Sequence, residues 1–384
     1  MKEKIYKKLF ASNRLRKLGR EVAQKVQRES ALITNLPSVG VHTFLKYIEE
    51  NYKDITKDKK TEIIFFEIVK ENTDIKELSN LISKHIRAKL EKGYTKELGA
   101  DEAINYLLEK GKRLLIIINR IERIAEAPET LSYLETLRAI NLYDVRFLLG
   151  SSITSIVNPR IYKGAGMVTG ANLIIIPPYS KKEFRKLIKV YKEVFGWKTP
   201  IKFVGEIYKL SGGFPGIAKY VIKYINESEL LKLNKEDLLN EQTLIFKLEN
   251  IVHELKINGL IKNNELNLEK IGVLKEIGIV TNANKLKVGL LESFLKTRAD
   301  KDQVKEFRKE LSAQEYKLYK FVEKTSPKLV TLDEIAKEIW GKNASTKYSM
   351  WAMYKLISNV NKKIGKIGYE IKNYRGRGYT LVSK

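Results

Sequence analysis

The sequence predicts an α/β fold with a parallel sheet, followed by a smaller, mainly helical domain. Between residues 30 and 180, apolar runs of strand length alternate with stretches of helical periodicity. Strands that are apolar along their whole length are typical of parallel sheets with helices on both faces. Beyond residue 311 the pattern becomes three amphipathic helices followed by a hairpin. The length of 384 residues likewise favours two or three domains over one.

The net charge indicates what the chain binds. Lys and Arg number 72 against 46 Asp and Glu, which gives +26, and a chain this basic is attracted to polyanions, most commonly nucleic acid. The excess gathers at two places: residues 1–29 hold ten basic and three acidic side chains, and residues 347–384 hold nine and one. Aromatic residues are interleaved with the basic ones in the second segment. We therefore expect double-stranded DNA as the partner; the alternative is a Lys-rich composition that only keeps the chain soluble.

Several classes of protein are excluded or not expected. The chain has no cysteine, which excludes disulfides, cysteine metal sites and thiol catalysis. Its three histidines, His42, His85 and His253, are far apart without ligand-type spacing, so a zinc enzyme is not expected. No apolar run approaches the roughly 18 residues of a membrane helix, and the basic start MKEKIYKKLF does not resemble a secretory signal. We expect a cytoplasmic protein that does not enter a membrane.

The elements of the α/β region follow from the apolar pattern. A basic helix is expected within residues 1–29. The predicted strands are the apolar runs 30–35, 61–69, 113–118, 145–149 and 173–176. The predicted helices between them span 41–51, 70–90, 101–110 and 131–140. In such sheets ligands bind at the carboxyl ends of the strands, so the residues that follow each strand are candidates for a site.

The first strand is followed by NLPSVGVHTFL, which resembles the phosphate loop GLPGVGKTTLL of archaeal ATPases of the AAA+/STAND type. Pro37, Gly40 and Thr43 keep the pattern. In one register Val41 replaces the Lys and His42 the magnesium-binding hydroxyl residue; shifted by one, His42 replaces the Lys and Thr43 supplies the hydroxyl. Neither register offers a Lys to reach the β and γ phosphates. An ordinary strand-to-helix turn is the alternative interpretation of this segment.

A second motif of these ATPases has lost the residues that support ATP hydrolysis. The family places Asp-Glu after four apolar residues; here the apolar residues 115–118 are followed by Asn119 and Arg120. The amide of Asn119 lacks the charge that holds Mg²⁺, and Arg120 stands where a Glu would polarise the attacking water. Two losses at two strand ends predict a decayed ATPase module without catalytic residues or enzyme activity. No cofactor is expected, while weak binding of ATP or ADP through backbone N–H groups of the loop stays open.

The resemblance extends over about residues 13–245. Residues 145–152 resemble the sensor strand of the family, 177–184 the start of its helical lid, and 211–218 the GG-x-PG start of a lid helix. It implies a P-loop-like parallel sheet with a helical lid, while residues 246–298 are similar to a winged helix that closes many such ATPases, with a plain helical connector as the alternative. The predicted domains are, in order, a basic N-terminal helix (1–29), the degenerate ATPase-like core (30–177), the lid (178–245), the connector (246–298), a linker helix (299–310) and a C-terminal domain (311–384).

Residues 311–384 carry the most specific resemblance. The segments LSAQEYKLYKFV, LDEIAKEIWG, ISNVNKKIG and YRGRGYTLV resemble the LT-x-x-E-x-x-LL, L-x-x-x-VWG, HI-x-x-LR-KK-LG and VRG-x-GY-x-L pattern of OmpR/PhoB-type winged-helix DNA-binding domains. A capping box is expected at Ser312, and Ser345 or Thr346 is expected to cap the third helix. The resemblance implies a mainly α winged-helix domain that binds DNA. The polar residues 299–311 do not supply the four-stranded sheet that opens the domain in that family.

The third helix of this domain divides into two faces. The core face is predicted from spacings of 3, 4, 3 and 4 between the apolar residues Met350, Met353, Ile357, Val360 and Ile364. The opposite face and the wing turn are expected to contact DNA through Lys347, Trp351, Tyr354, Lys355, Ser358, Asn359, Lys362, Arg375 and Arg377. Asn359 suits a bidentate contact with adenine, and Lys355 a contact with guanine. Arg375 and Arg377 suit phosphates or a minor groove. A merely solvated polar face is the alternative.

Together the two resemblances predict a duplex-DNA-binding regulatory protein, either a transcription regulator or a replication-initiator-like protein, with an ATPase fold that has become a scaffold. One alternative is an active ATP-dependent switch with unusual phosphate-loop chemistry. Another is an ATPase that maintains a plasmid or mobile element. The architecture leaves a homo-oligomer open as a further assembly.

Overall fold

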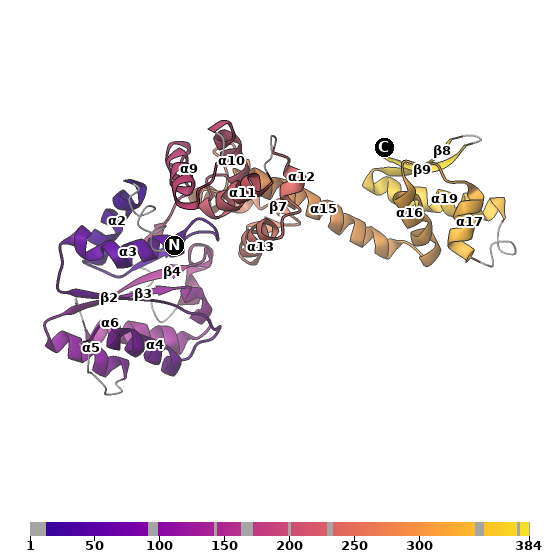
Figure 1. Cartoon of the computed structure of the whole chain (residues 1–384). Coiled ribbons are helices and arrows are strands. Elements are labelled where there is room, and N and C mark those ends of the chain that lie inside the picture. Colours follow the sequence, from indigo (N-terminus) through magenta and orange to yellow (C-terminus); the bar gives the residue numbers. More distant parts are fainter. Residues whose placement is uncertain are drawn as a thin grey trace. The chain divides into compact units, whose positions relative to one another are not determined.

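The computed structural model describes residues 13–90, 99–141, 144–162, 172–198, 201–228, 233–341, 349–374 and 377–383. The chain forms two compact units, Met1–Phe294 and Leu295–Lys384. In Figure 1 the first unit runs from indigo to orange and the elements that end the second are yellow. Within the described ranges, no helix is long and apolar enough to cross a membrane. The same ranges contain no group of three or more His, Asp or Glu side chains that could hold a metal ion.

A five-stranded parallel sheet forms the centre of the first unit (Figure 1). Its strands are β1 (Ala31–Thr34), β2 (Thr61–Glu67), β3 (Arg113–Asn119), β4 (Val145–Ser151) and β5 (Leu173–Ile175). They lie in the order β2-β3-β4-β1-β5, and each neighbouring pair is parallel. The predicted α/β fold is therefore confirmed. β5 is less buried than expected because it has a neighbour on one side only, and Leu173 is 40% exposed.

Helices cover both faces of this sheet (Figure 1). One face carries α2 (Asn13–Val26) and α3 (Val41–Thr56), and the other carries α4 (Ile75–Arg87), α5 (Ala100–Glu109) and α6 (Pro128–Ile140). On the second face Ile116, Ile104 and Leu134 belong to one continuous buried cluster. Burying such a cluster away from water is the main force that holds a sheet between two layers of helices. Short helices also occur at η1 (Ile121–Ile124), α7 (Thr154–Val157), η2 (Pro159–Tyr162), η3 (Ile201–Phe203) and η4 (Leu268–Lys270).

The predicted helical lid follows β5. It consists of α9 (Lys181–Phe195), α10 (Val204–Ser211), α11 (Pro215–Glu227) and α12 (Lys235–Leu238). The Ser180 hydroxyl accepts from the N–H of Glu183, and the Glu183 carboxylate accepts from the N–H of Ser180, which closes a capping box at the start of α9. α11 has Pro215 in its first turn, where the missing N–H would have no partner in the helix.

The segment after the lid stays within the first unit up to Phe294. α13 (Gln242–Ile257) leads to a short antiparallel hairpin of β6 (Ile261–Lys262) and β7 (Glu265–Leu266), and then to α14 (Ile271–Glu276). After α14 an isolated antiparallel bridge joins Val280 to Leu286. α15 (Gly289–Glu310) is one continuous helix, so the helix predicted for residues 299–310 already begins at Gly289.

The second unit is mainly helical and ends in a hairpin. Its elements after α15 are α16 (Ala313–Thr325), α17 (Leu332–Trp340), α19 (Met350–Ile364), η6 (Gly365–Ile367), β8 (Tyr369–Tyr374) and β9 (Gly378–Ser383). β8 and β9 pair in antiparallel fashion, and Tyr379 of β9 also exchanges both backbone hydrogen bonds with Val330, at 2.8 and 2.9 Å. The helices enclose a core that includes Leu318, Ile335 and Met353. The predicted order of three helices and a hairpin is confirmed.

The capping of these helices was predicted in part. The box at Ser312 is present, since its hydroxyl accepts from the N–H of Glu315 at 3.3 Å. For the third helix, Ser345 and Thr346 lie outside the described residues. The hydroxyl that caps α19 is that of Ser349, which accepts from the N–H of Ala352 at 3.1 Å.

One residue of the predicted core stripe is misplaced. Met353, Ile357, Val360 and Ile364 are buried as expected, but Met350 is 59% exposed, so its assignment to the core is wrong. Met350 is the first residue of α19, and the stripe of buried residues begins only at Met353. The spacing of apolar residues continues past the point where the packed core ends.

Candidate functional sites

The loop between β1 and α3 is the segment that resembles a phosphate loop. Ser38 and Gly40 both have positive φ, 71° and 108°, so the backbone turns sharply before α3 begins. Gly40 adopts such a φ without strain, whereas Ser38 does not. Asn35, at the end of β1, is buried and donates through Nδ2 to the carbonyl oxygens of Ile176 and Ile277. The loop is thus anchored by a side chain to the segments that follow β5 and α14.

The lid packs directly on this loop. The N–H of Gly216, in the first turn of α11, donates to the carbonyl oxygen of Ser38 at 2.9 Å. A Cβ on Gly216 would lie 2.7 Å from the Cβ of Ser38, so the two backbones touch. A Cβ on Gly40 would lie 3.7 Å from the ring of Pro215. The hydroxyl oxygen of Ser38 is buried there and has no hydrogen-bond partner among the described residues. This side of the loop is therefore covered by the lid.

A carboxylate that sequence reasoning missed joins the two degenerate motifs. Nδ1 of His42 lies 2.9 Å from Oε1 of Glu67, and Nδ2 of Asn119 donates to the same oxygen. Glu67 is the last residue of β2, directly beside Asn119 in the register of β2 and β3. Burial opposes ionisation of Glu67, but the hydrogen bonds from Asn119 and His42 outweigh it and hold the pKa of this carboxyl below its usual value. His42, Glu67 and Asn119 thus form one hydrogen-bond network that joins α3 to the ends of β2 and β3.

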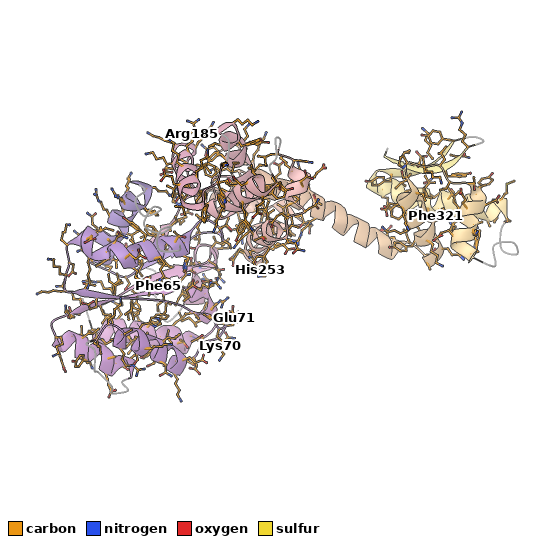
Figure 2. All side chains as sticks on the ribbon, viewed as in Figure 1. Phe65, Lys70, Glu71, Arg185, His253 and Phe321 are labelled. Carbon is orange, nitrogen blue, oxygen red and sulfur yellow. The ribbon has the colours of Figure 1, made fainter. Side chains whose placement is uncertain are left out.

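The surroundings hold this network in place. Phe65 of β2, labelled in Figure 2, has its ring centroid 5.7 Å from that of His42 and 3.8 Å from Nζ of Lys46. On the other side, a Cβ on Gly150 of β4 would lie 2.5 Å from Oδ1 of Asn119. Only glycine at position 150 leaves room for the Asn119 side chain. The arrangement therefore depends on residues from three neighbouring strands.

The other residues predicted for a vestigial nucleotide site lie around the network of His42, Glu67 and Asn119. Pro37 is half-buried in the loop, Val41 and Thr43 are half-buried in the first turn of α3, and Arg120 is exposed. Arg120 has a φ of 65°, which is uncommon for a residue with a side chain. Its charge contributes to the lowered pKa of Glu67. Residues from both motifs are thus close together, but the group they surround is a carboxylate of the protein itself.

Asn119→Asp, which restores the carboxylate of the resembled ATPases, is expected to destabilise the first unit at neutral pH. It replaces a donor to Glu67 by a like charge, with an expected loss of about 1–3 kcal/mol. In the folded variant the two carboxyls raise each other's pKa above the value in the unfolded chain. The loss in free energy of unfolding is therefore complete above the folded-state pKa, and it shrinks as the pH falls towards about 4. Urea unfolding at a series of pH values measures it. Asn119→Ala, which adds no charge, should show no such recovery in acid; equal pH profiles would contradict the network.

The second candidate site is the exposed face of α19. Trp351 is 70% exposed and Tyr354 47% exposed, and Lys355, Ser358 and Lys362 are also exposed, while Asn359 is half-buried. Nζ of Lys355 lies 4.9 Å above the ring of Trp351. Large exposed aromatic side chains are unusual on a surface that faces only water. These predicted contact residues, all on one helix, do share one face.

Polar contacts fix the orientation of α19 in the domain. Asn361 donates through Nδ2 to the carbonyl oxygen of Ile371 at 2.9 Å, and its Oδ1 accepts from the N–H of Ile371 at 2.7 Å, which joins the helix to β8. Lys363 forms an ion pair with Glu315 of α16 at 2.6 Å. The Lys363 ammonium helps hold the pKa of Glu315 below its usual value against the effect of burial. The exposed face is thus presented by a helix that is anchored on both sides.

The structure describes part of the predicted wing, the hairpin of β8 and β9. Arg377 is exposed and precedes β9, whereas Lys347 and Arg375 lie outside the described residues. Tyr374, at the end of β8, is 40% exposed, and Nζ of Lys372 lies 5.6 Å from its ring. β8 therefore carries one basic side chain, Lys372, between two tyrosines at its ends.

No protein-family model matches the chain. No curated protein matches it either.

Comparison with solved structures finds distant likeness in fold. The chain is similar to the Orc1 protein of Aeropyrum pernix in complex with DNA, at 13% identity over 96% of this chain and 87% of that one, with a TM-score of 0.36. It is similar to a Walker-type ATPase of Pyrococcus abyssi, at 14% identity over 77% and 95% of the two chains, with a TM-score of 0.44. It is also similar to the RuvB Holliday junction branch migration motor of Thermotoga maritima, at 14% identity over 96% and 91%, with a TM-score of 0.35. With TM-scores below 0.5, none of these likenesses decides what this chain does.

Proposed function

We propose that the chain is a duplex-DNA-binding regulatory protein, of a transcription-regulator or replication-initiator-like kind. In this proposal the C-terminal domain is a winged helix that binds DNA through α19 and the β8–β9 hairpin. The α/β module is a scaffold that does not hydrolyse ATP.

The exposed face of α19 is the observation that carries the proposal. It presents Trp351, Lys355 and Lys362 on a helix whose other side is buried, next to a hairpin that begins its second strand after Arg377. Residues 347–384 contain nine basic side chains and one acidic one. A positively charged helix face with a neighbouring basic hairpin suits a major groove and the adjoining phosphates. A merely solvated face would not account for the exposed Trp351.

Two observations support the scaffold role. Asn119 and His42 hold a carboxylate of the protein, Glu67, where Mg²⁺ and phosphate chemistry would need Asp, Glu and Lys. The backbone of α11 touches that of the loop at Ser38. This donor set does not fit Mg²⁺–ATP.

The affinity for duplex DNA is expected to depend steeply on salt. We assume that the C-terminal domain and the N-terminal basic segment together neutralise about six phosphates. The logarithm of the binding constant, plotted against the logarithm of the salt concentration, should then fall with a slope of about −5. Fluorescence anisotropy with the full-length chain and a labelled duplex measures it. A slope near zero would contradict the role assigned to the basic residues.

Substitutions should separate the helix from the wing. Asn359→Ala or Lys355→Ala is expected to reduce the difference between a preferred site and random DNA by about 1–3 kcal/mol for each lost base contact. Arg377→Ala or Arg375→Ala should weaken binding to all duplexes about equally, because a wing contacts mainly backbone. Arg185→Ala, an exposed arginine on α9 that Figure 2 labels, serves as the matched control and should change neither. Full discrimination in folded Asn359→Ala and Lys355→Ala variants would contradict the assignment of α19 as the reading helix.

A further inference from the structure

We propose that the first turns of α19 select A·T base pairs through apolar contacts with thymine methyl groups. This inference rests on the proposed function and names the class of DNA sequence that the interface prefers. The surface concerned consists of Met350, Trp351 and Tyr354, which we term the apolar turn.

The apolar turn is exposed and yet ordered by its own contacts. Met350, Trp351 and Tyr354 are 59%, 70% and 47% exposed. The hydroxyl of Tyr354 lies 3.9 Å from Sδ of Met350, and Lys355 lies over the ring of Trp351. Beneath them Met353 is fully buried. Three large side chains therefore stand exposed on the first turns of α19.

Their position on the helix decides what they would meet. In helix-turn-helix proteins the N-terminal residues of the recognition helix contact base edges in the major groove. The apolar group that base pairs present in that groove is the 5-methyl group of thymine. Met350 and Trp351 are the first two residues of α19. The apolar surface at this end of the helix suits the methyl group of thymine.

The amide of Asn359 favours the same base pairs. It matches adenine, the partner of thymine. Arg bound to guanine is the commonest specific contact in protein–DNA complexes, and α19 has no Arg. Lys363 is paired with Glu315 in the domain, so Lys355 is the residue near the apolar turn that suits guanine. Asn359 and the apolar turn thus converge on A·T pairs.

The test uses the full-length chain and a pool of duplexes with a randomised central segment. Sequences that the protein retains should be enriched in A·T pairs at the centre of the site. In the best duplex, each contacted thymidine is then replaced by deoxyuridine, which removes the methyl group alone. We expect binding to weaken about fourfold for each methyl group that the protein covers.

Variants link the effect to the apolar turn. Trp351→Ala should weaken binding to the thymine duplex. Replacing thymine by deoxyuridine should then cost the variant less affinity than it costs the unmodified protein, because the two changes remove the same contact. Phe246→Ala, which removes an aromatic side chain that is 57% exposed on α13, is the matched control and should behave like the unmodified protein.

The outcomes separate this inference from the proposed function. Absence of binding to any duplex would overturn the proposed function itself. Binding with G·C-rich selected sites, or with equal affinity for thymine and deoxyuridine duplexes, would overturn the inference and leave the proposed function standing. Loss of self-association in Trp351→Ala with unchanged DNA binding would show the apolar turn to be a contact between copies of the chain, and would equally overturn the inference.

Discussion

Full-length protein incubated with Mg²⁺ and ATP is expected to release no phosphate above a protein-free control, with or without duplex DNA. If the two motifs correspond to those of the ATPases that they resemble, Val41 stands where a Lys would reach the β and γ phosphates, and Asn119 and Arg120 stand in place of the two carboxylates. Phosphoryl transfer depends on electrostatic stabilisation, and one positioned arginine alone is worth on the order of 10³–10⁵ in rate. Loss of several such groups should leave turnover undetectable in a phosphate-release assay.

His42→Ala separates activity of this chain from that of a contaminating ATPase. His42 is the residue that replaces the Lys or the hydroxyl residue, depending on the register. Turnover of about 1 s⁻¹ in the unmodified protein would lie within the ordinary range of enzymes. If this turnover disappeared in His42→Ala, the module would be an active ATPase with unusual chemistry. That result would favour the ATP-dependent switch over the scaffold.

Met353→Ala is expected to destabilise the C-terminal unit severely, and Met350→Ala to leave it nearly unchanged. Met353 is fully buried in the core of that unit, so its truncation removes buried apolar surface and leaves a cavity, at a cost of about 2–5 kcal/mol. Met350 is 59% exposed on the same helix, and its truncation should alter stability by less than about 0.5 kcal/mol. The pair isolates the effect of burial, since residue type and helix are shared.

Hydrogen exchange of the α19 amide groups in the full-length chain measures this difference, because protection in a core helix reports the free energy of opening that unit. The Met353→Ala variant should lose protection throughout α19. Equal protection in the two variants would contradict the orientation of α19, and with it the exposed face on which the DNA-binding proposal depends.

The sheet could be predicted from the sequence because its strands are buried on both sides. The runs that became β3 and β4 are apolar at almost every position, and such runs suit a covered parallel sheet. Starts of helices were predicted where the capping chemistry is local, as at Ser312. In these cases the information lies within a few neighbouring residues, so one sequence is sufficient.

What could not be predicted depends on contacts between distant segments. Glu67 was missed because its partners, His42 and Asn119, are 25 and 52 residues away along the chain, and only the strand register brings them together. In the sequence, Glu67 shows only as a carboxylate inside the predicted strand 61–69. Met350 was misassigned because helical periodicity shows which residues share a face, but not where the core beneath that face ends.

One titration tests most directly whether this is a DNA-binding protein on a non-hydrolysing scaffold. The full-length chain is titrated onto duplex DNA over a series of salt concentrations, with and without Mg²⁺ and ATP. A DNA-binding protein on a non-hydrolysing scaffold should give a slope of about −5 and the same affinity in the presence and absence of ATP. A flat salt dependence, or duplex binding that requires ATP, would contradict it.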